Sequence, residues 1–165
     1  MSHAPTINLK CLSGQGQPKA RGLVDREKVK DTVYSFLRRM GVEAIFWDPE
    51  TDRFVLPYVI EGKRVMVYVM FLDDYKWVVT LADLYDLNEL PEHVNREELY
   101  RRLLSDNFTR YETRYGIDFD NHLVALAEAR SDELDYENFS TEFAGVLGSA
   151  ARFVAEIAPE MGIPV

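Results

Sequence analysis

The sequence predicts an α+β domain in which helices lie on one face of an antiparallel sheet. Three segments repeat apolar residues at helical spacing, and six shorter runs have strand character. Turn-forming residues separate the strands, which come in runs between the helices instead of alternating with them. The predicted element order is α-β-β-β-β-α-β-β-α, and a chain of 165 residues suits one such domain.

The first helix is predicted to begin after Asp25, whose short acidic side chain suits the N-cap position. Gly41 is expected to end it, since glycine readily adopts the backbone conformation that closes helices. Apolar residues spaced by four, three, one and three positions form its predicted buried stripe: Val29, Val33, Phe36, Leu37 and Met40.

Four strand-like runs follow, and an antiparallel meander is the simplest way to assemble them: 42–47, 53–60, 63–72 and 75–81. Glu61 and Gly62 are a tight hairpin signal between the second and third runs. Pro57 predicts an edge position for the second run, because proline has no backbone N–H to donate to a neighbouring strand.

A connector over residues 83–94 leads to the second helix, which Asn95 is predicted to cap. Residues 109–115 alternate strictly in side-chain type, and residues 122–130 form a second alternating run. These two runs predict a hairpin with one solvated face. A closing helix begins near Asp135 and keeps its helical period for about five turns.

Residues 1–22 are rich in Gly, Pro, Ser and Gln, which predicts a disordered arm ahead of a single α+β domain at 23–165. The arm holds three of the 19 basic residues and no acid. Residues 23–165 therefore carry 16 basic and 28 acidic side chains, a net charge of −12. A body of this charge repels phosphate, so nucleic-acid binding is not expected.

The chain has one cysteine, Cys11, so no internal disulfide can form, which favours a reducing compartment. No apolar run approaches the length of a membrane helix, and no secretory signal is visible at the N-terminus. We therefore predict a cytoplasmic protein without membrane attachment.

Sequence motifs for catalysis or cofactor binding are not found. No histidine has a second ligand at zinc spacing, and the acidic turn Asp48–Asp52 lacks the glycine of a calcium loop. Phosphate-loop and dinucleotide fingerprints do not occur either. We predict no enzyme, no cofactor and no metal site.

The leucine-rich second helix runs into Leu103–Phe108, and the hairpin that follows spans Arg110 to Arg130. With the long closing helix, this order resembles the YbjN family and the type III secretion chaperone-like fold over roughly residues 24–158. Members with this fold are typically non-enzymatic and often dimeric. The secretion chaperones hold partner segments in extended form, so the resemblance implies a protein partner.

The 63–72 strand is apolar on both of its faces. One side comprises Val65, Val67, Val69 and Phe71, and the other comprises Met66, Tyr68 and Met70. One side is expected to pack under the helices. The other needs a cover, because soluble monomers seldom expose large apolar patches. A second subunit, an extended partner peptide and the connector at 83–94 are the three candidate covers.

Two further regions are candidate contact surfaces. Gly145 and Gly148 lie in a run of small residues on the closing helix, where another element can approach closely. Either intramolecular packing or a dimer contact would use this surface, so a bulky residue at Gly148 is expected to disturb folding or association. Tyr111 and Tyr115 form the aromatic face of the predicted hairpin.

These observations predict a non-enzymatic, chaperone-like or regulatory domain that binds a partner protein segment as a homodimer. The alternative is a small ligand-binding sensor domain. Its pocket would lie between the sheet and the helices, lined by Trp47, Trp77 and tyrosines.

Overall fold

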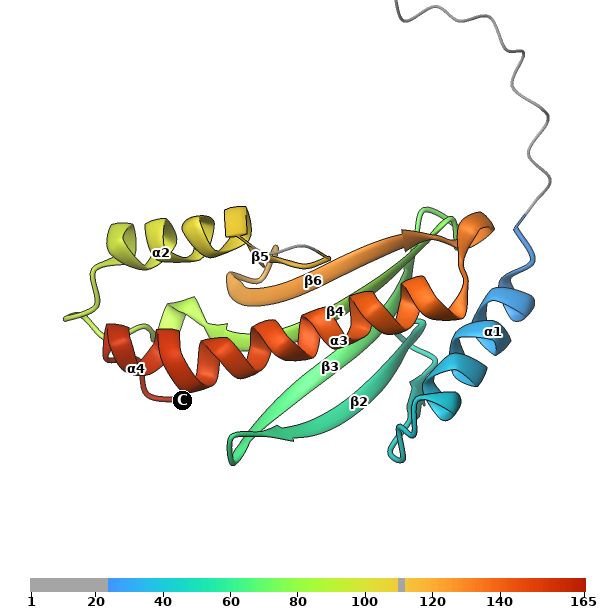
Figure 1. Ribbon diagram of the computed structural model, residues 1–165, viewed down its shortest axis with the longest axis horizontal. Helices are drawn as coiled ribbons and strands as arrows, with labels where there is room; N and C mark the ends of the chain where they lie inside the picture. The colour runs from blue at the N-terminus through green and yellow to red at the C-terminus, as the bar shows by residue number, and fades with distance from the viewer. Residues whose placement is uncertain (1–23, 110–111) are drawn as a thin grey trace, which may run out of the picture.

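A computed structural model describes residues 24–109 and 112–165, so the predicted N-terminal arm and Tyr111 lie outside the described residues. It confirms the predicted α+β class and element order, with a six-stranded antiparallel sheet in the order β1-β2-β3-β4-β6-β5 (Figure 1). The strands are β1 Phe46–Asp48, β2 Arg53–Ile60, β3 Lys63–Leu72, β4 Trp77–Asp86, β5 Arg114–Ile117 and β6 His122–Arg130. The α-helices are α1 Arg26–Arg39, α2 Arg96–Thr109, α3 Tyr136–Arg152 and α4 Ala158–Met161.

Three short elements complete the chain. The 3₁₀ turns η2 Leu87–Glu89 and η3 Ser131–Glu133 precede α2 and α3, and the π-helical turn η4 Phe153–Ile157 joins α3 to α4. The closing helix thus continues through η4 until Gly162, which has a left-handed backbone and ends it.

Side-chain caps begin the three long helices, as predicted. Asp25, Asn95 and Asp135 each accept a hydrogen bond from a backbone N–H two or three residues later, at 3.1, 3.0 and 2.9 Å. These bonds satisfy N–H groups that have no partner within the first helical turn.

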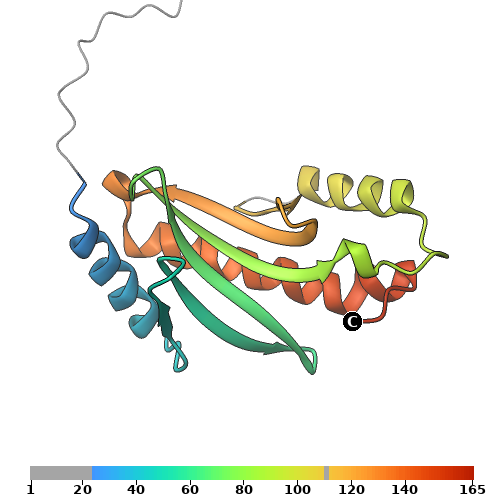
Figure 2. The ribbon, with the colours of Figure 1, turned by 180° about the vertical axis from the view of Figure 1, so that it is seen from behind.

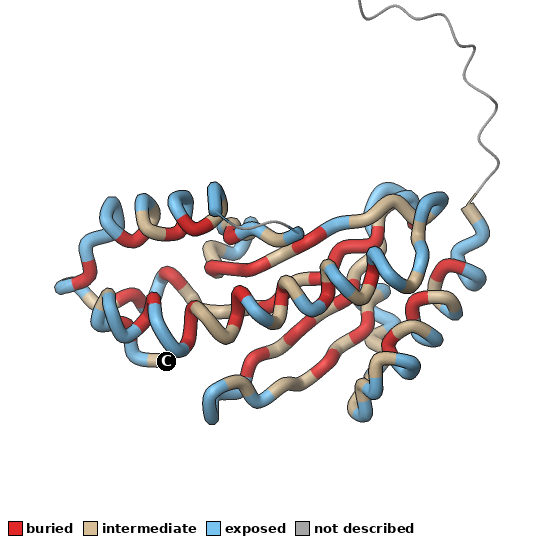
Figure 3. The backbone as a smooth tube through the Cα atoms, viewed as in Figure 1, coloured by how far each residue is buried: buried red, intermediate tan, exposed pale blue. Residues whose placement is uncertain are grey.

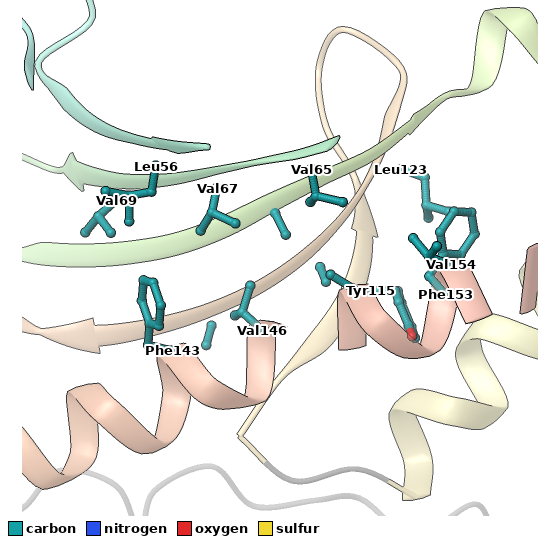
Figure 4. Close-up of a cluster of buried hydrophobic side chains, with 14 of the residues drawn as sticks. Leu56, Val65, Val67, Val69, Tyr115, Leu123, Phe143, Val146, Phe153 and Val154 are labelled. Carbon is teal, nitrogen blue, oxygen red and sulfur yellow. The ribbon is translucent and has the colours of Figure 1, made fainter. Parts of the chain in front are cut away.

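The core lies between the sheet and α3, which crosses the inner face of the sheet (Figure 1). Figure 4 shows Val65, Val67 and Val69 of β3 directed toward Phe143 and Val146 of α3. All five side chains are buried. Along β3, buried and less buried positions alternate (Figure 3), as a strand with two different faces requires.

α1 covers the part of the inner face that α3 leaves open, over β1 and β2. The Lys30 ammonium lies 3.8 Å from the ring centre of Trp47, and Phe36 packs against Phe139 at a ring distance of 5.7 Å. Aromatic and cation–π contacts of this kind add to the stabilisation from apolar burial. The helix therefore ties the first two strands to the start of α3.

Three predicted strand boundaries were wrong. β1 begins at Phe46 rather than at residue 42, and β4 extends to Asp86, so the predicted connector at 83–94 starts within the sheet. Of the described residues in the strand predicted at 109–115, Thr109 belongs to α2 and only Arg114 and Tyr115 lie in β5, which continues to Ile117. Alternating Thr, Tyr and Arg residues near a helix end do not distinguish a strand from a helical turn and loop.

We expect Phe143→Ala to lower the free energy of unfolding by about 3–5 kcal/mol, because it leaves a cavity under β3. Urea denaturation measures this change. Phe119→Ala is the matched control: Phe119 is fully exposed, and its loss is expected to change stability by less than about 0.5 kcal/mol. Equal effects of the two substitutions would contradict the assignment of the core to this face.

Candidate partner-binding surfaces

The outer sheet face is the side of the sheet opposite α3, and Figure 2 shows it from the front. Met66, Tyr68 and Met70 of β3 lie on it, as their alternation with the buried valines predicted. Their cross-strand neighbours on β4 are Asp83, Leu81 and Val79, in that order. Leu126 of β6 pairs with Leu81 and extends the apolar strip.

The chain's own connector does not cover this face. Leu87, Leu90 and Val94 are buried, and they belong to the same core cluster as the side chains under α3. Within residues 24–109 and 112–165, no helix crosses the outer sheet face (Figure 2). Of the three covers considered from the sequence, a second subunit and a partner peptide remain.

A hollow of about 570 Å³ lies on the outer sheet face. Its apolar floor includes Tyr68, Met70, Val79, Leu81 and Leu126. The Arg53 guanidinium lies 4.1 Å from the ring centre of Tyr68, so one side of the hollow is bounded by a cation. Leu72, which is 49% exposed, lies at the end next to the β3–β4 turn.

The opposite end of the hollow is acidic, and His122 lies among its carboxylates. Its Nδ1 atom lies 2.9 Å from the Asp83 carboxylate, and its Nε2 atom lies 4.0 Å from that of Asp86. Asp118 accepts the backbone N–H of His122 at 2.8 Å. The hydrogen bond to Asp83, with the neighbouring carboxylates, raises the pKa of His122 despite partial burial, which acts in the opposite direction.

A second apolar surface, the α2–β5 face, lies on the outer side of α2 and the adjoining strand. Leu104 is 67% exposed and Phe108 is 91% exposed, although both are large apolar side chains. Two shallow hollows of about 900 and 360 Å³ share Tyr100 and Leu104. Ile117 of β5 lines both the smaller of these hollows and the hollow on the outer sheet face, so the two surfaces meet at β5. From the sequence, Leu104 is predicted to share the buried stripe of the second helix with Leu99 and Leu103. Only Leu99 and Leu103 are buried, so the prediction for Leu104 was wrong and this face was missed.

Tyr115 is not available as a surface contact, which corrects its assignment as a binding residue. Its side chain is 7% exposed, and its hydroxyl donates to the Ser149 carbonyl at 2.9 Å. The Asn107 side chain bonds both the N–H and the C=O of Tyr115, at 2.7 and 3.1 Å. The end of α2 thus takes the place of a neighbouring strand at this point of β5.

The two glycines of the closing helix have different surroundings. A Cβ atom at Gly145 would lie 3.5 Å from Glu112 and 3.6 Å from Thr113, so this glycine lets the segment before β5 approach α3. Gly148 is exposed, and a Cβ atom there would meet nothing within 4 Å.

Burial, with nearby carboxylates, raises the pKa of Glu142 on the same helix to about 7.

The pocket expected for a ligand-binding sensor is not formed by both tryptophans. Trp47 packs on the inner side, with its ring 4.9 Å from that of Phe54. Trp77 pairs with Leu72 and Arg130, which lie on the outer side.

Among the described residues, no group of three or more His, Cys, Asp or Glu side chains could hold a metal ion. Within the same residues, no helix has the length and apolar character to cross a membrane.

Comparison with solved structures finds the same arrangement of strands and helices in several chains. A chain of the ExsC–ExsE complex is 21% identical, with a TM-score of 0.56 over 80% of this protein and 95% of that chain. A chain of the HopA1–SchA chaperone–effector complex is 15% identical, with a TM-score of 0.52 over 77% and 94%. The fold is type III secretion chaperone-like.

A third chain, from the ExoU–SpcU complex of the type III secretion system of Pseudomonas aeruginosa, is 16% identical. Its TM-score is 0.51, and the match covers 73% of this protein and 93% of that chain. The sequence matches no family model and no curated protein, so the resemblance to the YbjN family stays a prediction.

Asp83→Asn is expected to lower the pKa of His122, because it removes the carboxylate that favours the charged ring. A pKa raised by folding stabilises the protein below the unfolded value, about 6.5, and this stabilisation disappears as the pH rises through the folded value. The variant should therefore lose more stability at pH 6 than at pH 9. A titration followed by NMR and thermal unfolding at both pH values measure this. An unchanged pKa for His122 would contradict the prediction.

Proposed function

We propose that the protein is a non-enzymatic, chaperone-like protein that binds an extended segment of a partner protein, and that it does so as a homodimer. The outer sheet face is the observation that carries this proposal. It presents an apolar floor with one acidic end and a cation along one side, and no described element of the chain covers it. We also propose that the protein acts in the cytoplasm.

An extended segment fits the dimensions of this face. From Trp77 to Asp83, β4 advances by about 20 Å at roughly 3.3 Å per residue, which corresponds to a bound segment of similar length. Alternate side chains of such a segment would contact the floor and the solvent. Met70 suits this role, because a flexible thioether adapts to different side-chain shapes.

A second copy of the chain is the occupant we propose for the α2–β5 face. Large side chains such as Leu104 and Phe108 are costly to leave in water, and a two-fold dimer buries the same patch on both subunits. This face is separate from the floor of the outer sheet face, so dimer formation leaves the floor open. The two surfaces meet at Ile117, and a partner segment would therefore run close to the dimer contact.

The comparisons support a protein partner. The HopA1–SchA structure is a chaperone–effector complex, and the ExsC–ExsE and ExoU–SpcU structures are also complexes of two proteins. By extension, we propose that the partner of this chain is a protein segment rather than a small molecule. The separation of Trp47 from Trp77 gives no support to the sensor alternative.

Met70→Glu is expected to weaken peptide binding at least about tenfold, equivalent to about 1.4 kcal/mol, because it places a charge on the apolar floor. The probes are short linear peptides selected from a display library against the intact protein, with affinity measured by fluorescence anisotropy. Val59→Glu is the matched control, since Val59 is an exposed valine of β2 that does not line the hollow. Equal loss in both variants, or no selected peptide at all, would contradict the proposal.

A double variant, Leu104→Glu with Phe108→Glu, is expected to halve the molar mass seen by light scattering at micromolar concentration. The two charges would be buried without partners in the proposed dimer contact. Met70→Glu is the control and should keep the dimer mass. A parent protein that is a strict monomer would contradict the homodimer.

A further inference from the structure

We propose that residues 1–22 dock on the outer sheet face of their own chain, where they compete with the partner segment. The regulatory half of this inference rests on the proposed function. The docking itself does not, and it can be tested without a partner. Three features support it: the place where the described chain begins, the charge of the hollow, and the sequence of the segment.

The described chain begins beside one end of the outer sheet face. Arg26 at the start of α1 forms an ion pair with Asp74 in the β3–β4 turn. The same turn holds the end of β6, because the Ser131 N–H donates to the Lys76 carbonyl at 3.0 Å. Leu72, at this end, lines the hollow. The start of the described chain, at Arg26, therefore lies next to the rim of the hollow.

The length of the segment is sufficient. The 11 residues from 13 to 23 span up to about 36–40 Å when extended, at roughly 3.3–3.6 Å each. The outer sheet face from Trp77 to Asp83 is about 20 Å long at roughly 3.3 Å per residue. Residues 6–12 can therefore reach the floor of the hollow from α1 of the same chain.

The charges of the two parts are complementary. Residues 1–22 carry Lys10, Lys19 and Arg21 and no acid, whereas the remaining chain carries a net charge of −12. The lining of the hollow includes four carboxylates, from Asp83, Asp118, Asp120 and Glu128, of which Glu128 is ion-paired with Arg114 and Asp83 is bonded to His122. Arg53 is the one arginine in this lining, so acidic groups outnumber basic ones. An attached cationic segment is held near these carboxylates at high effective concentration, which favours its binding over that of free cations.

The segment also has a short apolar pattern suited to the floor. Ile7, Leu9 and Cys11 alternate with Asn8 and Lys10. In an extended backbone, this order places the first three side chains on one face and the polar pair on the other. The apolar face matches the Met70 and Leu81 floor, and Lys10 can then pair with the carboxylates at the rim.

A spin label on Cys11, the single cysteine, tests the docking in the full chain. Bound to the outer sheet face, it is expected to broaden the methyl NMR signals of Met66 and Met70, and to leave those of Met40 and Met161 sharp. A second labelled chain, Cys11→Ser with Ser13→Cys, moves the spin label by two residues. Selective broadening in only one of the two chains then shows that the label itself interferes with docking in the other. Equal broadening of all four signals, or none in either chain, would overturn the proposal.

Charge reversal supplies the matched control. The triple variant Lys10→Glu, Lys19→Glu and Arg21→Glu is expected to abolish the selective broadening. Lys28→Glu, Arg38→Glu and Lys63→Glu change the net charge equally at exposed positions outside the hollow and should preserve it. A mixed sample shows whether the docked segment comes from the same chain or from another chain. It combines spin-labelled chains without isotopes with isotope-labelled chains that carry no spin label. Broadening that also occurs between chains would overturn docking on the same chain.

The selected peptides test the competition. If the segment occupies the face in about nine molecules of ten, the triple variant binds these peptides about tenfold more tightly than the parent. Equal affinity for both proteins would overturn the competition and leave the proposed function intact. Selective broadening without binding of any peptide to either protein would instead contradict the proposed function and support the docking.

Discussion

The main constraint on this molecule is that β3 is apolar on both of its faces, while the helices within residues 24–109 and 112–165 cover only one of them. Val65, Val67 and Val69 pack under α3, and the burial of these side chains holds the closing helix on the sheet. The same strand places Tyr68 and Met70 on the opposite side. A sheet built in this way cannot form its core without also forming a second apolar surface, so the core and the proposed binding surface depend on one strand.

α2 has a different role from the other two long helices, because polar contacts anchor it as much as apolar ones. Asp106, which is buried, lies 2.8 Å from the Arg152 side chain of α3 and 3.3 Å from that of Arg102. Asn107, the next residue, bonds the backbone of Tyr115. These contacts fix the helix against both α3 and β5, and they leave Leu104 and Phe108 on its outer side. The buried Asp106 carboxylate and the half-buried Asn107 amide thereby orient the face proposed to join two subunits.

Much of the fold could be predicted from the sequence, since its signals are local. Asp25, Asn95 and Asp135 predict where the helices begin. The alternation of side chains along β3 predicts that Tyr68 faces outward. The candidate binding surfaces were harder to predict from the sequence. Tyr115 has the residue type of a surface contact, but its burial depends on Ser149, 34 residues further along the chain. The α2–β5 face likewise depends on how a helix packs on a distant strand, which no local pattern records.

The contact between Asn107 and Tyr115 limits how copies of this protein can assemble. β5 is an edge strand, and an edge with unsatisfied N–H and C=O groups invites further strands to pair with it. Here a side-chain amide already bonds both backbone groups of Tyr115, the second residue of the four-residue strand β5. A further strand therefore cannot bond the backbone of Tyr115, and a contact between copies at this edge has to use side chains instead of extending the sheet.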